Sequence, residues 1–226
     1  MERRMKKLIG MFAVTSLISG AVFADMYYDP EGDIATGNAN LDITQVEVTD
    51  DGVDLSVSLT VASLDGDWGN YLLFINLPGY NGSGDNDNPW GRNISGLEGA
   101  NYFIGSWLTG GGGDESYSYS PHNTTWSYLN DSYVDFSIDW STSTVTWTYH
   151  GFVDYYTNDG VTDIGFEVAT TGGNWGDPGI DLLGGEGGNW GEGSTGAWTN
   201  YEFSTVPAPS ALALLAVAGL ARRRRH

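Results

Sequence analysis

The feature that most constrains this chain is an alternation of apolar and polar residues on both sides of a short acidic turn. Residues 41–48 read LDITQVEV and residues 53–61 read VDLSVSLTV, with DDG at 50–52 between them. A period of two places every second side chain on one face of an extended strand, and a turn containing Gly joins two such strands into a hairpin. The chain is therefore expected to build a sheet with a buried face.

Further segments of strand length follow this hairpin. Residues 71–77 (YLLFINL) are continuously apolar, which is typical of a central strand covered on both faces. Residues 133–140 and 145–149 alternate again and predict a second hairpin. Other strands are expected at 102–108, 124–129, 164–169 and 198–203. About nine strands with Gly-rich connections predict an all-β fold, a two-sheet antiparallel β-sandwich of jelly-roll or immunoglobulin-like type over residues 25–205.

Two connections, residues 78–100 and 170–197, are long for a compact domain. Loops of more than about 15 residues are usually functional or disordered. The second connection contains GGNWGD at 172–177 and GGNWGE at 187–192, so that a Trp and an acid recur in the same places. This repeat is either low-complexity sequence or a purposeful repetition.

Residues 1–24 have the features of a secretory signal peptide. Four of the first seven residues are basic, an apolar segment follows, and Val22 and Ala24 are the small residues that a cleavage site requires. We therefore expect cleavage between Ala24 and Asp25.

Residues 206–226 have the features of a second targeting segment, at the C-terminal end of the sequence. Val206, Pro207, Ala208 and Pro209 precede an apolar run at 211–221, and the chain ends in four Arg and one His. A helix of about 11 residues spans roughly 16 Å, short of the roughly 30 Å hydrocarbon core of a membrane. We expect this sorting helix to insert only transiently into the inner membrane, with the Arg cluster inside.

The order of these parts resembles the PEP-CTERM sorting signal of Gram-negative bacteria that make extracellular polysaccharide. The resemblance rests on Val206, Pro207, Pro209, the apolar run and the Arg cluster at 222–225, while Ala208 stands where the commonest form has Glu. It implies recognition by an exosortase-type sorting protease, followed by release or attachment at the cell surface.

The beginning of the middle region resembles DOMON-like and family 9 carbohydrate-binding module sandwiches. Residues 29–33 (DPEGD), 41–43, 71–75 and 101–105 (NYFIG) carry this resemblance. It implies a sandwich that binds a sugar or a cofactor, often with calcium.

Charge and motif content exclude several classes of function. All but one of the 29 acids, but only one of the nine Lys and Arg residues, Arg92, lie in residues 25–205. The resulting negative electrostatic field of residues 25–205 repels the phosphate backbone of nucleic acids, so we expect no nucleic-acid partner. There is no Cys, which excludes disulfides and thiolate chemistry. No hydrolase, zinc-protease or phosphate-loop motif occurs, and His122 and His150 are expected to be structural. We therefore expect a protein without catalysis.

Tryptophans in loops are the best candidates for a ligand site, because the apolar faces of sugar rings stack on aromatic rings. Trp90 follows the polar segment DNDNP at 85–89 and lies next to Arg92, in a long loop where binding residues tend to occur. For each loop Trp the alternative role is packing over the edge of the sandwich. The candidate ligand-binding residues are Trp90, Arg92, Trp107, Trp126, Trp175 and Trp190.

Calcium is the expected cofactor. It takes hard oxygen ligands from alternate positions of irregular loops, and the chain offers two such sets. Asp29, Glu31 and Asp33 form one, and Asp85 and Asp87 form the other. The alternative is that these acids are only a solvated surface.

Together these features predict a non-catalytic protein that is secreted or held at the surface of a Gram-negative-type cell, where it binds polysaccharide or organises the extracellular matrix. One alternative is a secreted glycan hydrolase or lyase that uses carboxylates of the two long loops. The other is a purely structural surface protein.

Overall fold

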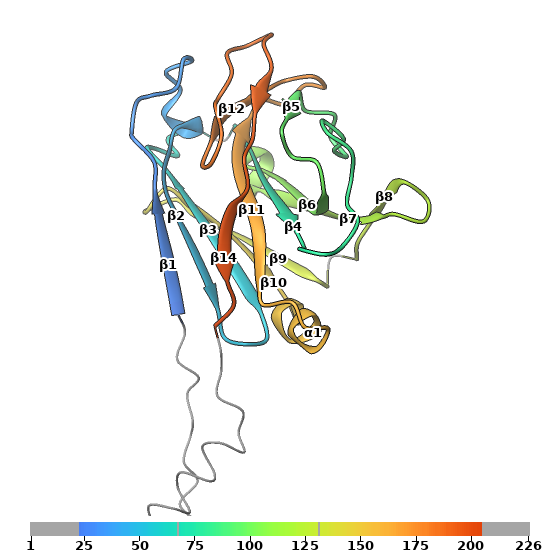
Figure 1. The fold of residues 1–226 in the computed structure, drawn as a ribbon. Coiled ribbons are helices and arrows are strands. Elements are labelled where there is room, and N and C mark those ends of the chain that lie inside the picture. Colours follow the sequence, from blue (N-terminus) through green and yellow to red (C-terminus); the bar gives the residue numbers. More distant parts are fainter. Residues whose placement is uncertain (1–22, 67, 131, 205–226) are drawn as a thin grey trace, which may run out of the picture.

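The computed structural model describes residues 23–66, 68–130 and 132–204, which form two antiparallel sheets packed face to face (Figure 1). In the order of pairing, the first sheet contains β1 (Phe23–Tyr28), β2 (Ile43–Asp50), β3 (Leu55–Val61), β10 (Thr144–Tyr149) and β9 (Val134–Asp139). The second contains β12 (Gly179–Leu182), β11 (Asp163–Thr171), β4 (Asn70–Asn76), β6 (Ala100–Trp107), β7 (Gly113–Ser120) and β8 (Thr125–Tyr128), with β14 (Thr199–Glu202) also on β11. The prediction of an antiparallel β-sandwich is confirmed.

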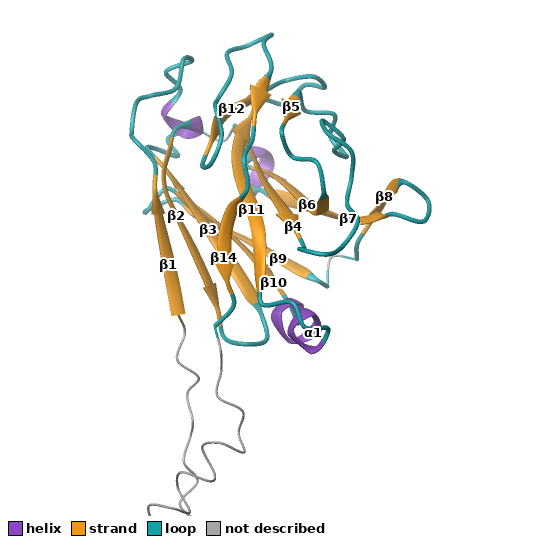
Figure 2. Ribbon diagram, viewed as in Figure 1, coloured by secondary structure: helices purple, strands orange, loops and turns teal. Residues whose placement is uncertain are grey.

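Helices contribute little to the described residues, as Figure 2 shows. They are α1 (Phe152–Asn158) and two short 3-10 turns, η1 (Ala39–Leu41) and η2 (Thr109–Gly111). None of the helices in the described part is long and apolar enough to cross a membrane.

The first predicted hairpin is formed by β2 and β3. The apolar residues of β2 change parity between Ile43 and Val46, and the pairing register shifts between Ile43 and Gln45. An extra residue in one strand lets the side chains on both sides of it point to the same face. Ile43, Val46 and Val48 are therefore all fully buried between the sheets.

The predicted central strand is β4, which lies between β11 and β6. Its residues 71–75 are buried on both faces because the second sheet contributes to two cores. Tyr71, Leu73 and Ile75 face the first sheet and join the main core. Leu72 and Phe74 face the opposite way and join a smaller core with Phe103 and Leu97, which the two long loops cover.

The sequence underestimated the number of strands. β7 (GDESYSYS) carries few apolar residues, and β12 lies inside a segment expected to be loop. β1 was not expected either, and it pairs Ala24 with Thr49 and Asp25 with Val48, so that the predicted cleavage position falls within a paired strand.

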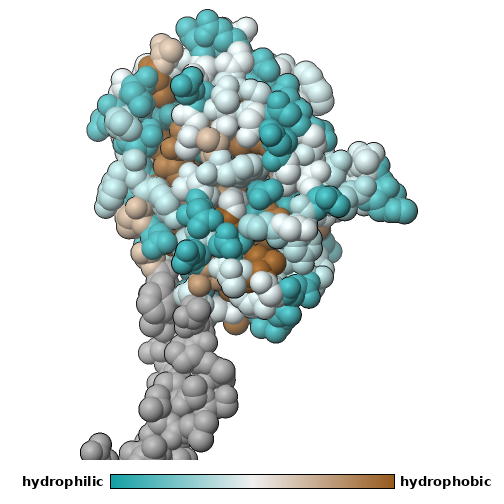
Figure 3. All heavy atoms as spheres, in the orientation of Figure 1, coloured by the Kyte–Doolittle hydropathy of each residue, from teal (hydrophilic) through white to brown (hydrophobic). Residues whose placement is uncertain are grey.

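Residues 1–22 and 205–226 lie outside the described residues, and with them most of the expected signal peptide and the whole expected sorting segment, Val206, Pro207, Ala208 and Pro209 included. The described chain begins with β1 and ends after β14 at the same end of the molecule (Figure 1). On the face drawn in Figure 3, hydrophilic residues predominate and apolar residues form small separate patches.

Candidate functional site

The two long loops pack against each other. The backbone N–H of Gly176 donates to the carbonyl of Gly91 at 2.9 Å, and the N–H of Asn93 donates to the carbonyl of Asp177 at 2.9 Å. Farther along, β5 (Ile94–Ser95) and β13 (Ser194–Thr195) form a short parallel pair. Segments about 80 to 100 residues apart in the sequence thus form one layer over the smaller core, which contains Leu72 and Phe74.

The repeated GGNWG segments fold into the same turn. In the first copy the Asp177 carboxylate accepts from the backbone N–H of Asn174 at 2.8 Å, and in the second the Glu192 carboxylate accepts from Asn189 at 3.4 Å. The Gly after each Trp has a positive φ, +83° and +81°, as the third position of a type II turn requires. The repeat therefore presents a Trp at the tip of each turn, and 81% of Trp175 is exposed.

Trp175 forms one side of a surface hollow of about 440 Å³, here called the tryptophan hollow. It lies at the end of the second sheet where Asn70 of β4 pairs with both Thr171 and Trp107. The residues that line it are Asn70, Pro89, Trp90, Arg92, Trp107, Glu115, Gly173 and Trp175.

Glycine backbone lies against each of the three tryptophan rings of the hollow, and Gly91 is the one that meets Trp175. A Cβ on Gly105 would lie 2.4 Å from the ring of Trp90, and one on Gly113 would lie 2.5 Å from the ring of Trp107. Any side chain at these positions would displace the ring above it, because real Cβ contacts are not this short. One side of each ring therefore rests directly on the backbone.

Arg92 and Glu115 supply the charges of the hollow. The Trp90 indole N–H donates to Glu115 Oε2 at 3.0 Å. The Arg92 guanidinium carbon lies 5.4 Å from the centre of the Trp90 ring, within reach of a cation–π interaction. Arg92 is only 5% exposed, and its guanidinium donates to the carbonyl of Asn174. Burial lowers the pKa of Arg92, and the nearby Asp177 opposes that shift.

Four of the six predicted ligand residues meet in the hollow, namely Trp90, Arg92, Trp107 and Trp175. The ring of Trp126 packs on the smaller core beside Phe103 instead. Trp190 lies against Gly172, where a Cβ would be 2.8 Å from its ring, and does not line the hollow. Asn70 and Glu115 lie in strands, and no local pattern marked them as site residues.

No protein-family model matches this chain, and no curated protein matches it.

Asp29, Asp33 and Asp181 form an acidic cluster that could hold a metal ion, because one carboxylate oxygen from each lies within 4.8 Å of the others. The cluster lines a second hollow of about 320 Å³. Asp181 is 5% exposed and accepts from the backbone N–H groups of Ile43 at 2.7 Å and Leu182 at 2.9 Å. Asp29 Oδ2 is buried without a hydrogen-bond partner among the described residues.

The surroundings of this acidic cluster disfavour the ionised form of its carboxyl groups. Burial raises the pKa of Asp181 to about 7, with a further contribution from the charges of Asp29 and Asp33. Burial also raises the pKa of Asp29 to about 6, and Asp33 and Asp42 add to the shift. A divalent cation would relieve both effects, since it supplies the missing counter-charge.

The other predicted metal ligands lie elsewhere. Glu31 is exposed and outside the acidic cluster. Asp85 Oδ1 accepts from the backbone N–H of Gly96 at 2.6 Å and so shapes the first long loop. Neither Asp85 nor Asp87 belongs to a group of possible metal ligands in the described part of the chain.

Proposed function

We propose that this protein binds polysaccharide through the tryptophan hollow and does so without catalysis. The observation that carries the proposal is the convergence of Trp90, Trp107 and Trp175 with Arg92 and Glu115 on one open hollow. Aromatic faces can stack on the apolar faces of sugar rings, and the charged groups can pair with hydroxyls that would otherwise lose hydrogen bonds to water. A volume of about 440 Å³ is in the range of small-ligand sites.

The shape of the hollow supports an extended ligand. The rings of Trp90 and Trp107 lie 6.3 Å apart and are tilted by 40°, so they do not form one flat platform. Two tilted surfaces suit a chain that twists from one sugar to the next. Trp175 projects beside them and can contact a further sugar unit.

The proposed location of the protein is the cell surface or the extracellular matrix, reached through a leader at 1–24 and the PEP-CTERM-like tail at 206–226. The arrangement of the chain ends supports this proposal. Asn70 and Trp107, at the hollow, lie at one end of the second sheet, whereas Asp163 and Glu202, near the exit of the chain, lie at the other. A protein held through its tail by an exosortase-type system would direct the tryptophan hollow away from the attachment point.

A second candidate function is calcium binding at Asp29, Asp33 and Asp181. The specific observation in its favour is the buried Oδ2 of Asp29, which has no hydrogen-bond partner in the described residues. Its neighbours Asp33 and Asp181 offer only carboxylate oxygens, which accept and do not donate. Calcium fits a set of carboxylate oxygens in irregular loops better than the softer transition metals do. The ion would join the loop between β1 and β2, which carries Asp29 and Asp33, to Asp181 in β12.

A glycan array probed with the full-length protein tests the proposed function. The most direct variant is Trp175→Ala, because this exposed ring can be removed without opening the core. We expect the affinity for a bound glycan to fall by at least about tenfold, by analogy with the roughly 1–3 kcal/mol of base–aromatic stacking. Trp140→Ala is the matched control, since Trp140 is exposed but does not line the hollow.

Three results would count against the proposal. Absence of binding to any glycan on the array contradicts the function, and equal loss of binding in both Trp variants contradicts the site. Release of reducing ends from a bound glycan would favour the hydrolase alternative, whose carboxylate pair would then have to be sought in the loops.

A further inference from the structure

A second aromatic site lies at the opposite end of β6 from the tryptophan hollow. It is a pocket of about 380 Å³, here called the tyrosine pocket. Tyr102, near the start of β6, faces the space between the sheets, whereas Trp107 at the end of β6 belongs to the hollow. The pocket is lined by Tyr102, Leu129, Tyr133, Tyr149, His150, Gly151, Phe152, Tyr155 and Tyr156.

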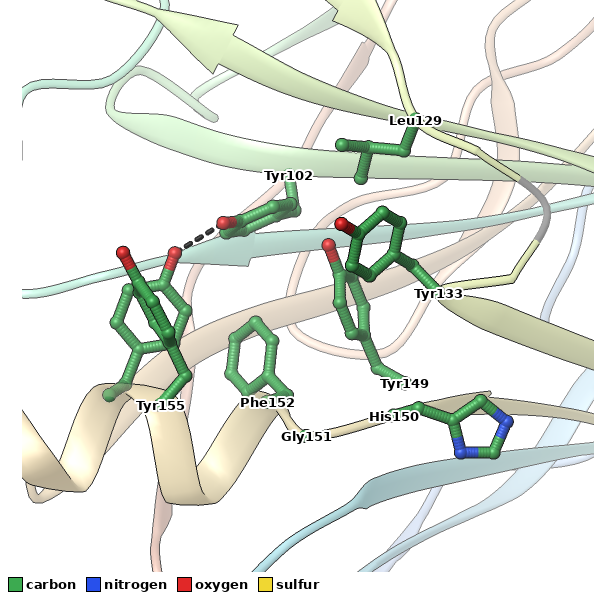
Figure 4. A pocket seen from close by; sticks show the side chains of 9 residues that line it. Tyr102, Leu129, Tyr133, Tyr149, His150, Gly151, Phe152 and Tyr155 are labelled. Carbon is green, nitrogen blue, oxygen red and sulfur yellow. Dashed lines mark hydrogen bonds between the residues drawn. The ribbon is translucent and has the colours of Figure 1, made fainter.

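The walls of the tyrosine pocket are aromatic on several sides. Figure 4 shows Tyr155 and Tyr133 on opposite sides of the space, with Tyr102 and Phe152 between them. Tyr102 is packed edge to face against Phe152 at 5.6 Å and against Tyr149 at 5.4 Å. These contacts fix the inner rings, while Tyr133 and Tyr155 form an exposed rim.

The polar side-chain groups of the tyrosine pocket are five phenol hydroxyls and the His150 ring. The hydroxyls of Tyr102 and Tyr156 form a hydrogen bond with each other. Burial raises the pKa of Tyr102, Tyr149 and Tyr156, so these phenols stay neutral. Among the described residues, no amide and no carboxylate side chain lines the pocket. A ligand in this pocket would therefore be held mainly by aromatic rings.

The charge around the tyrosine pocket is negative. Both ring nitrogens of His150 contact carboxylates, Asp54 at 3.0 Å and Asp135 at 2.9 Å. On the α1 side, the hydroxyl of Tyr80 donates to Asp159 at 3.2 Å, and the Tyr80 ring packs against Tyr156. If His150 is protonated, its single positive charge still leaves a net negative charge on the group that it forms with Asp54 and Asp135. The only Arg or Lys of the described residues is Arg92, which lies in the tryptophan hollow.

We infer that the tyrosine pocket binds an organic cation that carries a quaternary or trimethylated ammonium group. The faces of aromatic rings attract cations through their quadrupole, and surrounding rings can replace the weak hydration of a methylated ammonium. The acidic surface raises the local concentration of cations near the mouth. Such a ligand needs no hydrogen-bond partners, so that contact with the aromatic rings can hold it. This site is separate from the proposed polysaccharide site.

Choline and its neutral isostere 3,3-dimethylbutan-1-ol are the matched probes, because they have the same shape and differ in charge. In a proton NMR titration with the full-length protein at constant ionic strength, we expect a saturable upfield shift of the choline methyl signal, caused by the ring currents of the pocket. The neutral isostere should bind at least about fivefold more weakly, as the loss of cation–π attraction predicts.

Variants of the rim keep the test independent of folding. Tyr155 is 64% exposed, and Tyr155→Ala should weaken choline binding by about threefold to fivefold, while Tyr155→Phe keeps the aromatic face and should bind like the natural chain. Tyr28→Ala is the control, since Tyr28 is an exposed tyrosine of β1 outside the pocket. The inference is overturned if neither probe shifts saturably, if the isostere binds as well as choline, or if Tyr155→Ala and Tyr28→Ala behave alike.

Discussion

The ring of Trp175 lies on the backbone of Gly91, so closely that a Cβ on Gly91 would come within 2.3 Å of it. Trp175 belongs to the second long loop and Gly91 to the first. This contact joins the two loops at the tryptophan hollow and sets the position of its most exposed ring. Gly91 also has a φ of +57°, a conformation that disfavours any other residue.

Gly91→Ala is therefore expected to disturb both the loop and the ligand site. The added methyl group must push the Trp175 ring away, and the positive φ costs roughly 1–2 kcal/mol more for Ala than for Gly. We expect a lower unfolding free energy in chemical denaturation and a weaker glycan affinity. Gly84→Ala is the control in the same loop, because nothing lies within 4 Å of the Cβ that this substitution would add and because the φ of Gly84 is not positive. If the two variants behave alike, the contact does not position Trp175.

Calcium should raise the melting temperature if it occupies the acidic cluster. At a free concentration 100 times the dissociation constant, an ion that binds only the folded state stabilises it by about 2.7 kcal/mol, or roughly 5–11 °C for a domain of this size. Thermal melts with calcium and with a chelator, at matched ionic strength, measure this shift. Asp181→Asn should abolish it, whereas Glu31→Gln should keep it because Glu31 lies outside the acidic cluster. A shift that NaCl reproduces would reduce the effect to general screening.

The pH dependence of stability follows from the same carboxylates. Folding raises the pKa of Asp29 to about 6 and of Asp181 to about 7, so the folded state binds more protons than the unfolded state between about pH 4 and pH 7. Without a divalent ion, the unfolding free energy should therefore fall as the pH rises through this window. Denaturant titrations at several pH values in chelator test the sign, and Asp181→Asn should flatten the curve. An unfolding free energy that rises with pH in both proteins would contradict these pKa shifts.

Glu167 is expected to be a structural anchor of the second long loop. Its fully buried carboxylate accepts from the backbone N–H groups of Gly184 at 3.0 Å and Ala197 at 3.0 Å. Glu167→Ala leaves these donors unpaired in the interior, at a cost of about 1–3 kcal/mol for each. Glu167→Gln keeps an acceptor oxygen and should destabilise less, as chemical denaturation can measure. Equal destabilisation by both variants would mean that packing, not hydrogen bonding, is the contribution of Glu167.

Processing of both ends is the prediction with the simplest measurement. Intact mass of the extracellular protein should correspond to a chain that begins at Asp25 and lacks the Arg cluster at 222–225. Since Ala24 and Asp25 both lie in β1, cleavage between them would shorten this strand but leave residues 25–28 paired with β2. An extracellular form that retains the Arg cluster would contradict the sorting role of the tail.

The sequence by itself determined the parts of the fold that depend on neighbouring residues. The hairpins of β2 with β3 and of β9 with β10 follow from alternation across a short turn, and β4 follows from its continuous apolar run. A strand reports its burial through a period of two, so that five to eight residues are enough to identify it. Local polarity also indicated Trp90 and Arg92 as members of one site, because only one residue separates them.

Tertiary structure decided what depends on distant pairing. Asp181 meets Asp29 because packing of the two sheets brings β12 to the start of β2, where the backbone N–H of Ile43 donates to the Asp181 carboxylate. Glu115 reaches Trp90 only because β6 and β7 pair in one register, with Gly105 opposite Glu115. Whether a loop tryptophan lines a site, as Trp175 does, or covers a core, as Trp126 does, depends on which backbone lies beneath its ring. Strand register and close backbone approach arise from packing across the whole domain, and a local residue pattern does not contain them.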